Sequence, residues 1–362
     1  MTRSIIVSAA AVLVTAAGAS IVHADRPGRT LVVTMTNDPE ANQIKVYDAG
    51  TQALLQTLST HGKGGVGGNA RGVKQLGGEL VAAVNNGSST VALFRRDGDT
   101  LVFDKAVSTT SAPVSVDFGN DHMYVAGAAT VDSFVVHQNS VQGLDGTTGL
   151  ALAGGGTPPT GSTAQVGVVD ENQLLVTLKA DPDPGTVDIV ALRDGAVSGS
   201  APTAVSAPAG SLAPFGFSVN RDRTALITLA HSAQDGLFRN GAFTAVVGTA
   251  GQLGPCWTTR VGKYVFTANT GSGTISRLIS TGINVFVDSA AAAHVATGGN
   301  PLDIDADAGV FALIDHGAGQ SHISLFTYNE FGELAASGAP ITVGVPDANG
   351  VAVMAVSVTD RG

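Results

Sequence analysis

Three side chains that could transfer a proton lie at the ends of apolar segments of this chain. His231 closes the segment ALITLAH, and Asp315 and His316 close the segment VFALIDH. An imidazole that is oriented by a carboxylate is an effective general base near neutral pH. We therefore predict His316 with Asp315, or His231, as the catalytic groups. The alternative is that Asp315 and His316 are two polar residues in a turn.

A second set of polar residues could hold a substrate. Arg71 offers a planar fork for a carboxylate or another anion, but an arginine bonded to backbone carbonyls is an open alternative. Trp257 is the only tryptophan, and it could stack on a ligand or pack between structural units. The other residues that we predict to bind substrate are Asn69, Asn269, Asp303 and Asn349.

Sequence motifs for metals and cofactors are missing from the chain. Asp303, Asp305 and Asp307 begin like a calcium loop, but Ala308 and Ile314 stand where that loop needs glycine and glutamate. Cys256 is the only cysteine, which makes it either a nucleophile with a nearby base or a small buried side chain. No GxSxG, HExxH, paired CxxC or phosphate-binding glycine loop occurs. We expect no metal site and no cofactor.

The elements that must position these residues form a repeat. Seven apolar segments recur, and their aligned positions lie 39 to 51 residues apart: Val32, Val81, Tyr124, Leu175, Leu226, Val265 and Phe311. Each segment is followed by a further strand pattern, and all but the first are preceded by one. A period of about 40–50 residues with four strands is typical of a β-propeller. The chain is thus predicted to be all-β, with seven blades.

The ends of the chain predict how the ring closes. The first unit lacks its opening strand, whereas residues 348–358 resemble an opening strand with nothing after it. We expect this C-terminal strand to pair with the N-terminal blade, which would protect two exposed strand edges. A pair of β-sandwiches with accidental regularity is the alternative, but it would not explain this complementarity.

Propeller geometry brings the candidate residues together. The first strand of a blade lines the central channel, and the second runs antiparallel to it. The start of the first strand and the end of the second therefore open on the same face. This places Arg71, Trp257, His231 and His316 at one polar mouth of the channel.

Three segments carry a family resemblance: GPCWTTRVGKYVFTANTGSGTIS, APVSV with DHMYVAGAATVDSF, and GGNPLDIDADAGVFALID. They resemble the repeats of the lactonase-like seven-bladed propellers, which include bacterial 6-phosphogluconolactonase-type proteins and fungal carboxymuconate lactonizing enzymes. The resemblance implies that the protein opens or closes a lactone of a small organic acid. A non-catalytic binding or surface-interaction propeller is the alternative function.

The sequence departs from the catalytic members of that family. Those members carry histidine and arginine after the opening proline and an acidic residue near the end of the second strand. In this chain only Arg71 matches the arginine, Cys256 and Trp257 take such a place in the sixth unit, and Asn269 stands where the acid would be. These departures favour the alternative of a binding protein.

The N-terminus predicts export. Arg3, an apolar run and the small-residue site at Ala24 form a signal peptide over residues 1–24, although an uncleaved membrane anchor is the alternative. The remaining domain, residues 25–362, would be secreted or periplasmic, monomeric and free of the membrane. Because the net charge is −10 and no basic run occurs, nucleic-acid binding is disfavoured.

Overall fold

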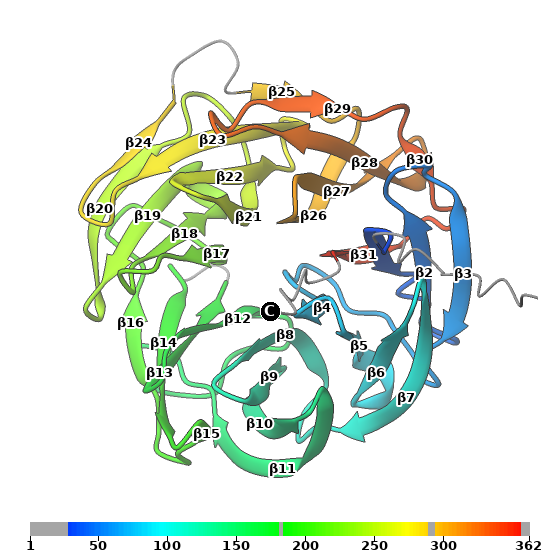
Figure 1. The fold of residues 1–362 in the computed structure, drawn as a ribbon. Helices are drawn as coiled ribbons and strands as arrows, with labels where there is room; N and C mark the ends of the chain where they lie inside the picture. The colour runs from blue at the N-terminus through cyan, green and yellow to red at the C-terminus, as the bar shows by residue number, and fades with distance from the viewer. Residues whose placement is uncertain (1–27, 181–183, 289–293, 356–362) are drawn as a thin grey trace, which may run out of the picture.

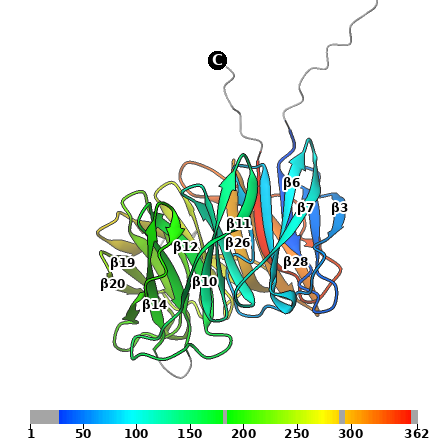
Figure 2. The same cartoon turned by 90° about the horizontal axis from the view of Figure 1, so that it is seen from below.

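The computed structural model describes residues 28–180, 184–288 and 294–355. The predicted signal peptide lies outside the described residues. Within the described ranges, seven antiparallel sheets stand around a common axis like the blades of a propeller (Figure 1). Figure 2 shows the ring from the side. The predicted all-β, seven-bladed fold is therefore confirmed.

The first strand named in each blade is the innermost one. Blade 1 consists of β31 (Asn349–Met354), β1 (Leu31–Met35), β2 (Gln43–Asp48) and β3 (Leu54–Ser59). Blade 2 consists of β4 (Val73–Leu76), β5 (Leu80–Asn85), β6 (Thr90–Asp97) and β7 (Thr100–Ser108), with the 3-10 turn η1 (Asn86–Ser88). Blade 3 consists of β8 (Pro113–Gly119), β9 (His122–Gly127), β10 (Thr130–His137) and β11 (Ser140–Gly149).

Blade 4 consists of β12 (Thr163–Asp170), β13 (Gln173–Leu178), β14 (Thr186–Arg193), β15 (Ala196–Val197) and β16 (Thr203–Ser206). Blade 5 consists of β17 (Pro214–Val219), β18 (Ala225–Leu229), β19 (Gln234–Arg239) and β20 (Ala242–Gly248), with the 3-10 turn η2 (Ala230–Ser232). Blade 6 consists of β21 (Pro255–Val261), β22 (Tyr264–Asn269), β23 (Thr274–Ser280), β24 (Val285–Val287) and β25 (His294–Ala296). Blade 7 consists of β26 (Asn300–Asp307), β27 (Val310–Gly317), β28 (Gln320–Tyr328), β29 (Leu334–Ala336) and β30 (Ile341–Thr342).

The repeating apolar segments are the second strands of the blades. Strands β1, β5, β9, β18 and β22 are buried at every position, because each sheet packs with both faces against its neighbours. A strand buried on both faces gives a continuous apolar run instead of an alternating pattern. Between blades 6 and 7, for example, Phe266 meets Phe311 edge to face with ring centres 5.3 Å apart.

One expected loop contains a strand. The composition of residues 198–213 predicts a surface loop, but this segment includes β16, which pairs with the first half of β14. The second half of β14 pairs with β15. Blades 6 and 7 divide their outer edge in the same way. Backbone pairing at an open edge thus gives the insertion a structure that its composition does not indicate.

The C-terminal strand closes the ring as predicted. Strand β31 pairs antiparallel with β1, and Val33 lies opposite Ala352 in the register. The Thr34 hydroxyl adds a 2.7 Å bond to the Gly350 carbonyl.

Within the described ranges, no helix is long and apolar enough to cross a membrane.

We predict that removal of residues 348–362 abolishes cooperative thermal unfolding, because blade 1 loses its inner strand and the buried edge of β1 becomes exposed. The control is removal of residues 356–362, which leaves β31 whole and should preserve a single sharp transition. Both transitions can be followed by circular dichroism. Unchanged melting of the longer truncation would contradict the closure.

Candidate functional site

The predicted mouth of the channel is the face on which the innermost strands begin, which we call the mouth face. The face on which these strands end is called the opposite face. A short segment before β4, residues 69–71, bonds to five other blades at the mouth face, and three of these blades are not adjacent to blade 2. The Trp257 indole donates a 2.8 Å bond to the Asn69 carbonyl, and the Ala70 amide donates a 3.0 Å bond to Ala164. The Arg71 amide donates a 3.2 Å bond to Asp303.

We call residues 69–71 the plug, because partners of this blade 2 segment lie in blades 4, 6 and 7, none of which is adjacent to blade 2. Two local features allow this path. Arg71 adopts a left-handed backbone with φ 57°, and Gly68 has φ 56°, a region that glycine adopts without a steric cost. A Cβ on Gly68 would also lie 3.1 Å from Lys179 Cε. The glycine-rich sequence before β4 is therefore what lets the chain turn into the channel.

Five of the six predicted substrate-binding residues meet at the plug: Asn69, Arg71, Trp257, Asp303 and Asn349. Asn69 is 1% exposed and donates a 2.7 Å bond to the Val114 carbonyl. Asn349 donates a 2.6 Å bond to the Asn69 side-chain oxygen. Trp257 is buried and packs edge to face on Phe215. The spacing argument therefore brings these residues together, but the structure uses them to hold one another.

The Arg71 side chain has an acidic partner that sequence reasoning missed. Its guanidinium lies 3.7 Å from the Asp117 carboxylate, which Lys74 also approaches to 3.7 Å. Asp117 further accepts a 3.0 Å bond from the Val168 amide. The anion that Arg71 faces is thus part of the protein. Asp117 lies within the inner strand β8, where an alternating sequence gives no signal for a contact with the neighbouring blade.

Asp303 is a buried carboxyl group beneath the plug. Both of its oxygens accept backbone amides, one from Ile304 at 2.9 Å and one from Arg71 at 3.2 Å. Burial raises the pKa of Asp303 to about 7; nearby Asp305 raises it further and Arg71 opposes the shift. With two donors and 2% exposure, Asp303 anchors the plug.

Asp315 and His316 point to different partners. His316 Nδ1 lies 2.9 Å from the Pro346 carbonyl on the blade 1 side, whereas Asp315 Oδ1 lies 3.5 Å from His322 Nδ1. In this geometry a backbone carbonyl orients His316, and the catalytic role of the Asp315 and His316 pair stays a prediction. Both residues belong to β27 instead of a turn, and adjacent strand residues face opposite sides of a sheet.

His322 is the imidazole that sequence reasoning missed. The tight turn between Gly317 and Gln320 sets the register in which Asp315 lies opposite His322. Gly299 makes room for the carboxylate, because a Cβ there would lie 2.4 Å from Asp315 Oδ1. Burial raises the pKa of Asp315, and His322 opposes the shift. This pair could have been predicted from the sequence through the register of the β27–β28 hairpin.

The remaining candidates do not join this pair. The His231 side chain is exposed in η2 and, within the described ranges, forms no hydrogen bond or ion pair. Asn269 is buried and donates bonds to Ser276 and Thr274 at 2.7 and 3.1 Å. The catalytic and substrate-binding roles of all these residues stay predictions.

Two further reactive groups lie at the mouth face. Burial lowers the pKa of Lys179 to about 8, while nearby Cys256 opposes the shift. The Lys179 ammonium donates to the carbonyls of Gly161 and Thr163. Burial raises the pKa of Cys256 to about 11, so the group is a thiol at neutral pH and lacks the thiolate that a nucleophile needs. Among the described residues, no group of three His, Cys, Asp or Glu side chains could hold a metal ion.

Comparison with known proteins supports the fold. No family model matches the chain, and no curated protein matches it in sequence. A candidate 6-phosphogluconolactonase from Bacteroides uniformis superposes with a TM-score of 0.66 at 15% identity, over 91% of this chain and 100% of the other.

Two further structures share the fold. The Pseudomonas aeruginosa periplasmic gluconolactonase gives a TM-score of 0.63 at 14% identity, over 91% of this chain and 99% of the other. Virginiamycin B lyase from Staphylococcus aureus gives 0.55 at 13%, over 75% and 84%. The chain is thus a seven-bladed propeller with a lactonase-type fold.

We predict that Asn69→Ala lowers the free energy of unfolding by about 2–4 kcal/mol, because it leaves the buried Val114 carbonyl and the partly buried Asn349 amide without partners. Asn86→Ala is the matched control: it removes one 3.0 Å bond to Pro113 at a less buried site, and should cost about 1 kcal/mol. Urea denaturation measures both. Equal losses would show that the plug does not stabilise the ring.

Proposed function

We propose that this protein is an exported lactonase-like propeller that hydrolyses a lactone of a small organic acid. The observation that carries the proposal is the Asp315–His322 pair at the mouth face. The Asp315 side chain is 3% exposed, and the His322 side chain is 25% exposed. A buried carboxylate next to a solvent-accessible imidazole is the arrangement of a general base and its orienting group.

The pair supports a simple hydrolytic route. With Nδ1 directed to Asp315, the His322 Nε2 atom can accept a proton from water as its oxygen attacks the lactone carbonyl. Asp315 stabilises the imidazolium that forms. Collapse of the tetrahedral intermediate breaks the ring C–O bond, and the imidazolium returns its proton to the departing alkoxide. The product is a hydroxy acid, and the reverse sequence closes the ring.

We expect the purified mature protein to hydrolyse one or more members of a lactone panel, measured by acid release at constant pH. His322→Gln should lower kcat by about 10²–10⁴-fold, the usual contribution of a general base. His316→Gln is the matched control, because it removes a neighbouring imidazole that faces the other side of the sheet. No hydrolysis by the wild type, or full activity of His322→Gln, would refute the proposal.

A non-catalytic binding propeller is the second candidate. The plug favours it, because Trp257 and Asn349 both bond to Asn69 and Arg71 faces Asp117. Few of the predicted substrate-binding side chains are then available to a substrate on the axis. If the correctly folded protein hydrolyses no lactone of the panel, the non-catalytic binding propeller is the candidate that remains.

Export is the other part of the proposal, and it rests on the signal-like sequence of residues 1–24. We expect cleavage after Ala24, so that N-terminal sequencing of protein from the medium or periplasm begins at Asp25. A chain that keeps Met1 in the membrane fraction would contradict cleavage and favour the uncleaved anchor.

A further inference from the structure

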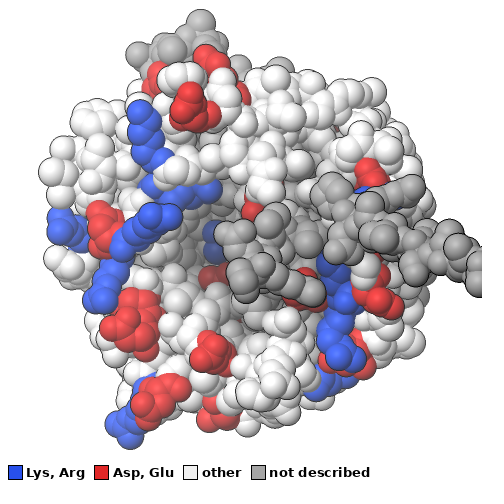
Figure 3. Space-filling view, viewed as in Figure 1, with Lys and Arg blue, Asp and Glu red and all other residues white. Residues whose placement is uncertain are grey.

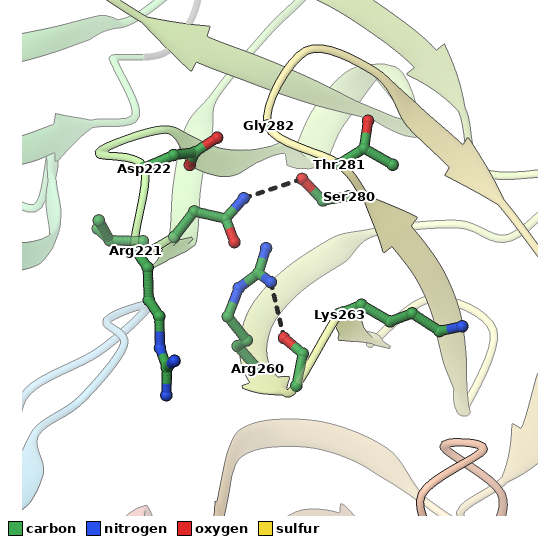
Figure 4. A pocket seen from close by; sticks show the side chains of 10 residues that line it. Arg221, Asp222, Arg260, Lys263, Ser280, Thr281 and Gly282 are labelled. Carbon is green, nitrogen blue, oxygen red and sulfur yellow. Dashed lines mark hydrogen bonds between the residues drawn. The ribbon is translucent and has the colours of Figure 1, made fainter.

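A basic cavity lies on the opposite face, between blades 5 and 6. Its volume is about 630 Å³. The cavity is lined by the turn after β17, the end of β21 and the turn after β23; the residues are Val219, Asn220, Arg221, Asp222, Arg260, Gly262, Lys263, Ser280, Thr281 and Gly282. Figure 4 shows that the labelled side chains come from these separate segments. The cavity is therefore built by two blades and not by a single loop.

Specific contacts hold the two blades together at this cavity. The Asn220 amide donates a 3.2 Å bond to the Ser280 hydroxyl, which joins blade 5 to blade 6. Gly282 has φ 82°, and a Cβ there would lie 1.6 Å from Asp222 Oδ2. A side chain at Gly282 would thus collide with the Asp222 carboxylate. The cavity walls are fixed by these contacts before any ligand binds.

The charge of the cavity is opposite to that of the chain. Arg221, Arg260 and Lys263 line the cavity with a single acid, Asp222, in a protein whose net charge is −10. In the space-filling view, Lys and Arg side chains gather at the left of the ring, over blades 5 and 6 (Figure 3). Within the described ranges, the Arg221 side chain forms no hydrogen bond or ion pair. A local excess of positive charge attracts anions.

Arg260 supplies the most specific signal. Its Nη1 atom donates a 2.9 Å bond to the Gly262 carbonyl, but its Nε and Nη2 atoms are buried and, in the described structure, have no acceptor. Burial lowers the pKa of Arg260 and Asp222 opposes the shift, yet a guanidinium stays charged at neutral pH. Nε and Nη2 form the edge that grips a carboxylate or phosphate with two parallel bonds. Buried donors without acceptors are rare in proteins and call for a partner.

We propose that this cavity is a binding site for a small organic oxyanion. Its carboxylate or phosphate group would bind between Arg221, Arg260 and Lys263, and a rotation of the Arg260 side chain would bring its buried Nε–Nη2 edge to the ligand. The side chains of Asn220, Ser280 and Thr281 would bond to hydroxyl groups on the rest of the ligand. A hydroxylated acid fits both the charge and the polar lining. The site lies on the face opposite Asp315 and His322, so it is separate from the proposed hydrolytic pair.

The test is isothermal titration calorimetry of the mature protein with L-malate, inorganic phosphate and glycerol. We expect malate to bind with a dissociation constant of about 1 mM or tighter, and neutral glycerol not to bind. Phosphate binding alone would support the oxyanion site and assign the tetrahedral group. Binding should weaken as salt is added, because the rim charges are exposed. Binding of neither anion would overturn the proposal.

Arg260→Gln should weaken anion binding about tenfold or more. Arg223→Gln is the matched control, because Arg223 belongs to the same turn but pairs with Asp170 and Glu171 and does not line the cavity. If Arg260→Gln fails to fold, the double variant Arg221→Gln/Lys263→Gln replaces it, since both side chains are exposed. Wild-type affinity in a folded Arg260→Gln protein, or in the double variant, would overturn the proposal. Lactone hydrolysis should be unchanged in Arg260→Gln, which distinguishes a failure of this site from a failure of the proposed enzyme.

Discussion

The antiparallel pairing of β31 with β1 is the constraint on which the rest of the structure depends. Each blade buries both faces of its central strands against its neighbours, so an incomplete ring would leave two apolar sheet faces in water. Pairing the last strand with the first blade buries both of these sheet faces. Because closure fixes the seven inner strands around one axis, it also determines which polar side chains can meet there. The plug, whose partners lie in five other blades, requires this closed ring.

The sequence predicted the architecture well because burial leaves a strong pattern. A second strand such as residues 264–269 is apolar along its whole length, and the spacing of such runs defined seven blades and the strand exchange at the ends. The outer edge of blade 4 was missed, because β16 lies in an insertion rich in small polar residues. Its structure comes from pairing with β14 and has no counterpart in local composition.

The candidate site was predicted only in part, and the reason differs from residue to residue. Strand direction correctly brought Asn69, Trp257, Asp303 and Asn349 toward the axis. It could not show that residues 69–71 cross the channel, because this path depends on left-handed backbone at Arg71 and Gly68. For His316 the strand length matters: because β27 extends to Gly317, alternation turns that side chain away from Asp315. Arg260 gave no signal, because its importance lies in donors that the fold leaves unpaired.

The register that places Leu31 opposite Met354 has a topological consequence. The first and last strands of the described chain lie side by side in one sheet. The covalent chain is therefore interrupted within blade 1, and no blade is structurally the first. A short peptide could join the two positions, and new ends could be opened in any exposed hairpin without changing the order of the blades around the axis. The coding sequence therefore sets which residue is synthesised first, and the structure of the folded ring does not depend on that choice.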